Sequence, residues 1–417
     1  MVKKIIVGVL VIVAGYFVFG EVKDLAVDYY TDNHMVRTTV APATEAPDQL
    51  CLTWAGDPAT TQAIQWRTAA TVEDGVVQYR LETAGEETAT EVPAVQTDSV
   101  DRLVENDPEN NRFTAKLEGL TPATAYAYRA GSKAKNLWSA WTPFTTAPTE
   151  ATPFSFVYMG DVQVGFDYWE TIVQKAHADF PSAAFYLIAG DLVNNGDYRD
   201  QWDFLFQSGR GVLDRRPLIP ALGNHDWDKK DIPQRYLDAF ALPENGPKNV
   251  HAEYAFSLRY GNALYIVLDS NFSIEEQASW LEEQLKATGA TWKFVMFHHP
   301  AFASRRARDN YELRDAWTPI FDKYHVDVAF TGHDHAYLRT FPMKGGQKVA
   351  TPAEGTYYIV SVAGNKYYDQ EVWDYAEKQF AEVSTYQVID IDTEPNRLTY
   401  KAYDEAGTVR DEFVIQK

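Results

Sequence analysis

Five apolar segments of this 417-residue chain each stop directly at side chains that are able to bind metals. Short apolar runs that alternate with helical patterns predict a parallel sheet covered on both faces. Ligands bind such a sheet beyond the carboxyl ends of its strands, so we expect all five groups to lie on one rim. The segments are FSFVYMGDVQ with Asp161, AAFYLIAGDLVNN with Asp191, PLIPALGNHDW with Asn224, His225 and Asp226, WKFVMFHHP with His298 and His299, and FTGHDHAYLRT with His333 and His335.

The last of these segments places two histidines one residue apart behind a glycine. In an extended chain His333 and His335 point to the same face, so both rings can reach one metal cluster. Neutral imidazole is a common metal ligand, and the preceding glycine allows a sharp turn. Two loop histidines alone are more often solvated or packed in a core, so the metal hypothesis depends on the other four segments.

The composition limits which partners the chain can have. A formal charge of −21 and a pI near 4.8 argue against nucleic acid, whose binding requires a basic surface. A phosphorylated substrate then needs a local positive charge, which a pair of divalent metal ions supplies. The single cysteine, Cys51, forms no internal disulfide, and the absence of a CxxC pair excludes a thiolate zinc site.

The N-terminus carries Lys3 and Lys4 ahead of an apolar run over residues 5–19. This run is short for a bilayer span and no clear cleavage site follows it, so a signal peptide and an uncleaved membrane anchor over residues 1–20 both stay open. In either case the basic flank stays cytoplasmic. We expect the rest of the chain to be exported, into the periplasm, the extracellular space or the outer side of a membrane.

Residues 21–46 mix charges with prolines and are expected to form a stalk or linker. Residues 47–147 show short alternating strands at the spacing of an all-β sandwich. The segment LTPATAYAYRAG within them resembles the tyrosine corner of fibronectin type III modules. No polar cluster with catalytic spacing occurs here, so a structural or binding role is expected for this domain.

From residue 152 to residue 417 strands alternate with helical patterns, which predicts an α/β domain. Ser273 and Glu276 predict a capping box at the start of a helix over 274–285. The strands near the C-terminus are expected to run antiparallel and to close a second sheet. Helical periodicity predicts three further helices, over 168–180, 199–213 and 310–324.

Taken in order, the motifs GD, GD, GNHD, HHP and GHDH resemble those of the binuclear metallophosphoesterases, also called calcineurin-like phosphoesterases. The preceding β-sandwich and the form GHDHAYLR are most similar to the purple acid phosphatase branch of that family. The resemblance covers the sandwich and nearly everything after it. It implies a catalytic domain of two packed sheets flanked by helices, in which a metal-bridging hydroxide attacks the phosphorus of a phosphate ester.

The resemblance also implies a set of ligands for two metal ions. Asp191 would bridge the pair, since a carboxylate can give one oxygen to each cation. Asp161 and His335 would complete the first site, with Gln163 as an extra oxygen ligand. The second site would be formed by Asn224, His298 and His333. We expect divalent ions, namely manganese, zinc or ferrous iron.

Beside the ligands, His225 is expected to donate a proton to the leaving group, and Asp226 to orient it through the other ring nitrogen. A purely structural role for His225 is the alternative. His299 is expected to support its loop, because its side chain alternates away from His298. Arg305, Arg306, Arg308 and Arg339 either contact substrate or lie in a solvated basic surface, so we do not assign them to the site.

Two positions depart from the purple branch. Asn194 stands where the branch has a tyrosine ligand, and Gln163 stands where the wider family usually has a histidine. A carboxamide lacks the phenolate orbital that donates charge to ferric iron, so we expect a colourless protein that holds divalent metals. Tyr198 lies seven residues after Asp191, beyond the family spacing, and would reach the metals only through a folded loop.

The leading functional hypothesis is an exported, acid-phosphatase-like phosphomonoesterase acting on small phosphate esters. A phosphodiesterase or nucleotide hydrolase with the same metals is the alternative, because the loops that admit or exclude a second ester arm decide between them. A catalytically inactive surface-binding protein is a third hypothesis, which the retained ligand set disfavours. The sequence does not define an oligomeric state.

Overall fold

A computed structural model of the chain describes residues 35–227 and 232–417. The predicted signal peptide or anchor over residues 1–20 lies outside the described residues. Among the described helices, none combines the length and the apolar character needed to cross a membrane.

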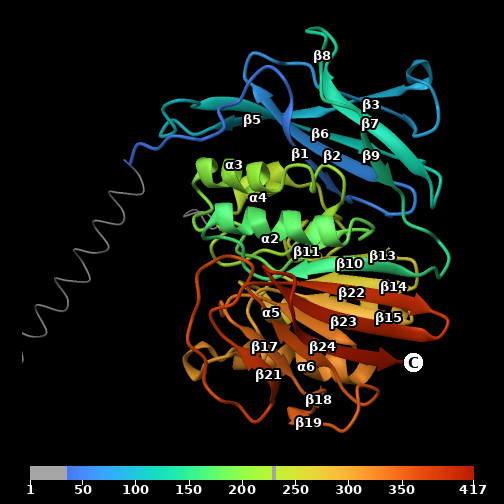
Figure 1. The fold of residues 1–417 in the computed structure, drawn as a ribbon, viewed down its shortest axis with the longest axis vertical. Coiled ribbons are helices and arrows are strands. Elements are labelled where there is room, and N and C mark those ends of the chain that lie inside the picture. The colour runs from blue at the N-terminus through green and yellow to red at the C-terminus, as the bar shows by residue number, and fades with distance from the viewer. Residues whose placement is uncertain (1–34, 228–231) are drawn as a thin grey trace, which may run out of the picture.

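The N-terminal part is a sandwich of two antiparallel sheets, drawn blue to cyan in Figure 1. One sheet has the order β1-β2-β6-β5 and the other β4-β3-β7-β8, with β9 paired to β7. The predicted tyrosine corner is present, because the Tyr126 hydroxyl accepts a hydrogen bond from the Thr121 N–H at 2.9 Å. The elements are β1 (Asp48–Thr53), β2 (Gln62–Ala69), β3 (Val76–Leu81), the 3₁₀ turn η1 (Glu86–Thr88), β4 (Thr90–Pro93), β5 (Val95–Val100), β6 (Glu109–Leu117), β7 (Ala125–Ser132), β8 (Leu137–Trp138) and β9 (Thr142–Thr145).

The second part contains two larger sheets and most of the helices (Figure 1). One sheet has the order β12-β11-β10-β22-β23-β24, and the other β13-β14-β15-β16-β20-β17-β21. Its strands are β10 (Phe154–Met159), β11 (Tyr186–Ile188), β12 (Leu218–Pro220), β13 (Phe256–Tyr260), β14 (Ala263–Val267), β15 (Trp292–Met296), β16 (Val328–Thr331), β17 (Tyr337–Thr340), β18 (Met343–Lys344), β19 (Gln347–Lys348), β20 (Tyr357–Val360), β21 (Ala376–Phe380), β22 (Thr385–Thr393), β23 (Asn396–Asp404) and β24 (Val409–Gln416).

The predicted α/β class is confirmed, and the apolar segments do form parallel strands. They are divided between the two sheets: β10, β11 and β12 are parallel in one, and β14, β15, β16 and β20 in the other. The expectation that the C-terminal strands close the second sheet is wrong for β22, β23 and β24. These strands extend the first sheet, because β22 pairs antiparallel with β10.

Aromatic rings fill the space between the two sheets. Phe156 of β10 makes edge contacts with Tyr265, Phe294 and Phe330 of the opposite sheet, at centroid distances of 5.4, 5.4 and 6.1 Å. Alternate residues of the same strands, such as Val295, face outward and pack against the helices. A strand that is buried on both faces needs no polar positions, which explains the continuous apolar runs in the sequence.

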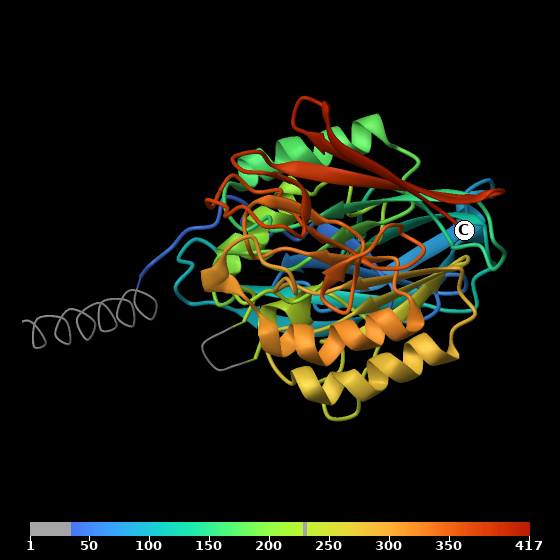
Figure 2. The same cartoon turned by 90° about the horizontal axis from the view of Figure 1, so that it is seen from below.

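Helices cover the outer faces of the two sheets. Figure 2 shows α5 and α6 side by side on one side of the molecule and α2 on the opposite side. The helix predicted to begin at a capping box does form, but Ser273 adopts φ 55° and its side chain makes no cap hydrogen bond. The sequence did not predict α4. The helices are α2 (Phe166–Asp179), α3 (Arg199–Ser208), α4 (Gln234–Ala239), α5 (Ile274–Ala287), α6 (Tyr311–Tyr324) and the 3₁₀ turn η2 (Arg306–Arg308).

Candidate metal centre

The structure brings the predicted metal ligands together where strands of both sheets end. Asp161, Gln163 and Asp191 follow the first sheet's strands β10 and β11, whereas His298 and His333 follow β15 and β16 of the second sheet. Ligand atoms of Asp161, Asp191 and His298 all lie within 4.8 Å of one another. Both sheets therefore contribute side chains to a single cluster.

One side of this cluster contains Asp161, Gln163 and His335. The Asp161 Oδ2 atom lies 3.2 Å from His335 Nε2. The Gln163 Nε2 atom lies 2.9 Å from the same His335 nitrogen and donates a hydrogen bond of 3.0 Å to Asp191 Oδ2. Gln163 thus reaches the site as predicted, but with its amide nitrogen turned toward the other ligands rather than its oxygen.

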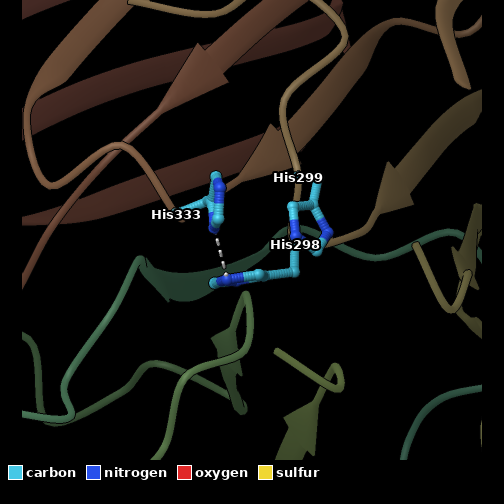
Figure 3. A group of neighbouring side chains, drawn as sticks. All are labelled: His298, His299 and His333. Carbon is cyan, nitrogen blue, oxygen red and sulfur yellow. Dashed lines mark hydrogen bonds between the residues drawn. The ribbon is translucent and has the colours of Figure 1, made fainter. Parts of the chain in front are cut away.

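The other side of the cluster is centred on His298. Its Nε2 atom lies 3.1 Å from Asn224 Oδ1, 3.1 Å from His333 Nδ1 and 3.3 Å from Asp191 Oδ1. Figure 3 shows the three rings of His298, His299 and His333 grouped, with a dashed line marking the contact between His298 and His333. Asp191 contacts residues of both sides and is placed as a bridging ligand would be.

The backbone is strained at three of the candidate metal ligands. Asp191, His333 and His335 have φ values of 50°, 69° and 46°, in the left-handed region that non-glycine residues rarely adopt. The prediction of an extended HxH segment is therefore wrong, because residues 333–336 form a bend that presents both rings. Such strain is concentrated at functional sites, where the surrounding structure imposes it.

Two glycines allow the loops to pack directly on the carboxylates. A Cβ atom on Gly223 would lie 2.2 Å from Asp191 Oδ1, and one on Gly332 would lie 2.1 Å from Asp161 Oδ1. These glycines come immediately before Asn224 and His333, so the backbones that carry both ligands can approach the acidic side chains. This close approach is the physical reason for glycine at the start of GNHD and GHDH.

The orientation of the side chains fits bound cations. His298 Nδ1 donates to the Ala189 carbonyl at 2.8 Å, and His335 Nδ1 donates to the Lys366 carbonyl at 2.9 Å. Each ring then turns its Nε2 atom toward a carboxylate oxygen. Asp161 Oδ2 and Gln163 Oε1 are buried without any hydrogen bond. Nitrogen and oxygen donors converging in this way suit zinc, manganese or iron.

The electrostatics of the cluster agree with this geometry. Burial and the nearby Asp191 raise the pKa of Asp161 well above its usual value. Burial would lower the pKa of His298, but the two aspartates raise it to about 9. Burial lowers the pKa of His335 to about 4 and that of His333 still further. Two of these rings are thus held in the neutral form that binds metals.

The predicted hydrogen bond between Asp226 and His225 is wrong. Asp226 points into the core, where its carboxylate accepts the backbone N–H groups of Leu192, Val193 and Gly223 at 2.8, 3.2 and 2.8 Å. Burial and the neighbouring Asp191 raise the pKa of this carboxyl to about 8. Asp226 therefore ties the loop behind the bridging aspartate to the GNHD loop.

His225 is oriented by the backbone instead. Its Nδ1 donates to the Asn194 carbonyl at 2.8 Å, and its own backbone N–H donates to Asp191 Oδ1 at 2.9 Å. Asn194, which replaces the family tyrosine, thus contributes its carbonyl oxygen to the site. The Nε2 atom of His225 remains for a ligand in the adjoining cleft.

His299 and Arg308 also contact the site. His299 does support its loop through Ser270, whose hydroxyl lies 2.9 Å from His299 Nδ1. Its ring also lies 4.2 Å from that of His333, which the simple alternation argument did not predict. Arg308 donates to Asp334 at 2.7 Å and to the His333 carbonyl at 2.7 Å, so it holds the GHDH loop. Arg339 is buried beside Asp411 and does not reach the site.

An open cleft of about 570 Å³ adjoins the cluster. Candidate ligand Asn224 and the proposed acid His225 both line it, together with His299. A molecule in this cleft can contact the cluster and the His225 ring at once. The remaining lining residues are Asn194, Asn195, Asp197, Trp227, Ser270, Asn271, Phe272 and Asn310.

Two family models match the chain. Residues 154–337 match the calcineurin-like phosphoesterase domain, and residues 47–146 match the purple acid phosphatase N-terminal domain. The structure of purple acid phosphatase PPD1 from yellow lupin (Lupinus luteus) has the same fold, with a TM-score of 0.75 at 17% identity over 89% of this chain and 74% of that one. The structure of PhoD gives a TM-score of 0.64 at 12% identity, over 90% and 92% of the two chains.

Relatives in sequence include proteins of bacteria and plants. An uncharacterized protein of Mycobacterium tuberculosis is 26% identical over 347 residues, which cover 73% of this chain and 64% of the relative. Purple acid phosphatase 15 of Arabidopsis thaliana is 23% identical over 285 residues, or 60% of this chain and 53% of the relative. The chain thus spans between half and two thirds of the length of these two relatives. Together with the fold and the arrangement of side chains, these matches show that the chain contains a calcineurin-like phosphoesterase domain, which follows a domain of the purple acid phosphatase N-terminal type.

Proposed function

We propose that the chain hydrolyses phosphate monoesters with two divalent metal ions held by this cluster. The observation that carries the proposal is the convergence of buried side chains beside an open cleft. They are the carboxylates of Asp161 and Asp191 and the rings of His298, His333 and His335. One related plant protein is named an Fe(3+)-Zn(2+) purple acid phosphatase, and it is 26% identical over 72% of this chain. That similarity supports a binuclear centre here as well.

The two metals would share Asp191 as their bridging ligand. Asp161 and His335 would complete the first site, and a half-turn of the Gln163 amide would bring its unpartnered oxygen toward the same ion. The second site would use three ligands, namely Asn224, His298 and His333. When bound, two such ions polarise the phosphoryl group and lower the pKa of water so that it attacks phosphorus at neutral pH.

The protein itself would supply positioning and a proton. The Asn194 carbonyl accepts a hydrogen bond from His225 Nδ1 at 2.8 Å and fixes the ring, so that Nε2 can deliver a proton to the departing oxygen. Asp226 and Arg308 hold the two loops that carry Asn224 and His333. Asp226 and Arg308 would therefore position the metal ligands without contacting the substrate.

Metal analysis followed by an assay on a panel of esters tests the proposal. We expect two metal ions per chain and hydrolysis of phosphomonoesters that stops on chelation and returns when metal is restored. Faster hydrolysis of a diester than of its monoester would replace the monoesterase with the alternative diesterase. If the metal-loaded protein hydrolyses no ester of the panel, the hypothesis of a catalytically inactive surface-binding protein is favoured instead.

We also propose that the chain is exported. The support is the sequence pattern of Lys3 and Lys4 ahead of the apolar residues 5–19. Mass spectrometry of the exported product would distinguish a cleaved signal peptide from a retained anchor. Retention of the full-length product in the cytoplasm would contradict both.

A further inference from the structure

Two aromatic side chains form one wall of the cleft, and we call them the aromatic shelf: Trp227 and Phe272. Trp227 lies three residues beyond the candidate ligand Asn224, and Phe272 lies on the loop between β14 and α5. Their rings meet edge to face, with centroids 4.8 Å apart and planes at 79°. Both line the same cleft as His225, so the shelf lies beside the proposed proton donor.

The exposed part of the shelf is held in place. Phe272 is 50% exposed, whereas Gln277 beneath its loop is fully buried. The Gln277 Nε2 atom donates to the carbonyls of Phe272 and Asp269 at 3.1 and 2.6 Å, and its Oε1 accepts from the Asp269 N–H at 2.9 Å. Trp227 is supported on its other side by Tyr254, at a centroid distance of 5.1 Å. The loop therefore presents a large apolar ring to solvent within a concave site, as ligand-binding surfaces do.

Amide groups in the same cleft are left with complementary hydrogen-bonding atoms. The Asn195 side chain uses Oδ1 to accept the Asp197 N–H, which leaves its Nδ2 as a donor. The Asn271 side chain uses Nδ2 to donate to Leu222 and Asp269, which leaves its Oδ1 as an acceptor. A planar ring that carries both donors and acceptors matches this pair, whereas a plain phenyl ring does not.

We propose that the aromatic shelf binds the base of a nucleoside monophosphate, whose phosphate occupies the candidate metal centre. The inference rests on the proposed phosphomonoesterase activity and names its substrate class. The cleft, at about 570 Å³, has the size of sites that bind drug-sized molecules and exceeds what phosphate alone requires. His225 lines the same cleft and its backbone N–H contacts Asp191, so its ring is placed to reach the ester oxygen of such a substrate.

Steady-state kinetics on three monoesters test the proposal: adenosine 5′-monophosphate, phenyl phosphate and glycerol 3-phosphate. Replacing Phe272 by Leu removes the ring and keeps an apolar side chain. We expect kcat/KM for the nucleotide to fall about 5- to 30-fold, the range of one base stacking contact at an exposed site. Glycerol phosphate should change less than twofold. Phe272→Tyr should retain the wild-type values, and Trp227→Phe provides a second variant on the shelf.

The matched control is Tyr311→Leu, which removes an aromatic ring that is 59% exposed and does not line the cleft. It should leave all three values unchanged. If Phe272→Leu lowers kcat/KM equally for the three substrates, the shelf does not bind a base, and the proposed phosphomonoesterase activity still stands. Equal losses on the nucleotide and phenyl phosphate would overturn the nucleoside assignment. Hydrolysis of none of the three by the metal-loaded wild type would count against the proposed activity itself.

A binding measurement separates the shelf from catalysis. Saturation-transfer NMR on adenosine reports binding of the base without hydrolysis, with glycerol as the negative probe. We expect transfer to adenosine in the wild type and in Phe272→Tyr, and a weaker signal in Phe272→Leu. Absence of transfer in the wild type would overturn the proposal whatever the kinetics show.

Discussion

Two regions of this molecule each group several buried carboxylates: the candidate metal centre and the junction between the β-sandwich and helix α3. At the junction each carboxylate meets cations of the same chain. Asp203 accepts from Arg67 at 2.7 Å and from Arg199 at 3.1 Å, and Arg37 pairs with Asp101 at 2.8 Å and with Asp200 at 2.7 Å. The charges of the junction are therefore balanced within the protein.

The candidate metal centre lacks that balance. Within the part of the chain that the structure describes, neither Asp161 nor Asp191 forms an ion pair with lysine or arginine; their charged or polar side-chain neighbours are histidines and Gln163. Burying an uncompensated charge is costly, so a buried carboxyl group without a cation either keeps its proton or binds a cation from outside. The comparison separates charges that stabilise the fold from charges that await a ligand.

The largest effect expected from this comparison is the loss of the bridge in Asp191→Ala. Two cations would then lack their shared anionic ligand, so we expect loss of bound metal and a fall in kcat/KM of more than about 10³-fold. Metal analysis and an assay on phosphomonoesters measure both. Asp167→Ala, at an exposed position of α2, is the matched control. A variant that keeps two metals and full activity would remove Asp191 from the centre.

His225→Ala tests the proton donor without disturbing the ligands. Because His225 contacts Asp191 only through its backbone N–H, the variant should retain its metals. We expect kcat to fall by about 10²- to 10⁴-fold on esters with poor leaving groups, and less on those with good ones. His177→Ala, in α2, controls for loss of a histidine far from the strand ends that carry the ligands. Equal losses on both kinds of ester would show that His225 is not the acid.

The junction should respond to mutation in the opposite way from the metal centre. Asp203→Ala removes one of the two carboxylates that Arg67 and Arg199 share, while Asp107 remains beside both, so we expect it to lower the free energy of unfolding by about 1.5–3 kcal/mol whether or not metal is present. Asp161→Asn instead removes a charge that lacks a cation. It should cost little stability in the chelated protein and abolish the stabilisation that added metal gives the wild type. Urea unfolding of the wild type and both variants, each with and without chelator, measures these effects. Recovery of the stability of Asp203→Ala on addition of metal would break the comparison.

The sequence alone predicted features that depend on local patterns of residues. Apolar runs that end in glycine and a ligand are local patterns, and they indicated the α/β class and the residues that meet at the metal centre. The glycines at 223 and 332 follow the same logic, because a backbone must pass next to a carboxylate. These local patterns did not show which strand belongs to which sheet, since strands buried on both faces look alike in either sheet.

Contacts between distant segments could not be predicted in this way. Asp226 follows His225 directly, yet its carboxylate accepts the backbone N–H groups of Leu192 and Val193 in another loop and of Gly223 in its own. Adjacency in the chain therefore gave the wrong partner. The capping box at Ser273 failed for a related reason, because the buried Gln277 accepts and donates the hydrogen bonds that order that loop.

Asp269 offers a finer test, since it is a buried carboxyl that has neither a metal nor an arginine. It accepts hydrogen bonds from Asn271, and burial raises its pKa to about 6. Between the ordinary carboxyl pKa and that value, the unfolded chain releases the proton while the folded protein keeps it. Folding stability is thus full at low pH and falls as pH rises toward 6, by up to about 3 kcal/mol.

Asp269→Asn should remove this pH dependence. The free energy of unfolding of the wild type, minus that of the variant, should fall between about pH 4 and pH 6 and stay constant above it. Chemical denaturation across that range, in chelator, measures the difference. A difference that does not vary with pH would show that Asp269 is ionised in the folded protein at all these values.

The smallest effect is expected at Tyr198, the tyrosine nearest in sequence to the position of the missing phenolate ligand. The structure assigns it to the junction, since the Arg37 guanidinium lies 4.0 Å from the centre of its ring. Without phenolate on a ferric ion there is no donor for a strong visible band, so iron-loaded protein should be colourless. Tyr198→Phe should leave the absorption spectrum and kcat unchanged and alter stability by less than about 1 kcal/mol, because phenylalanine preserves the ring under the cation. A visible band that disappears in Tyr198→Phe would move this residue from the junction to the metal centre and would break the distinction between the two regions.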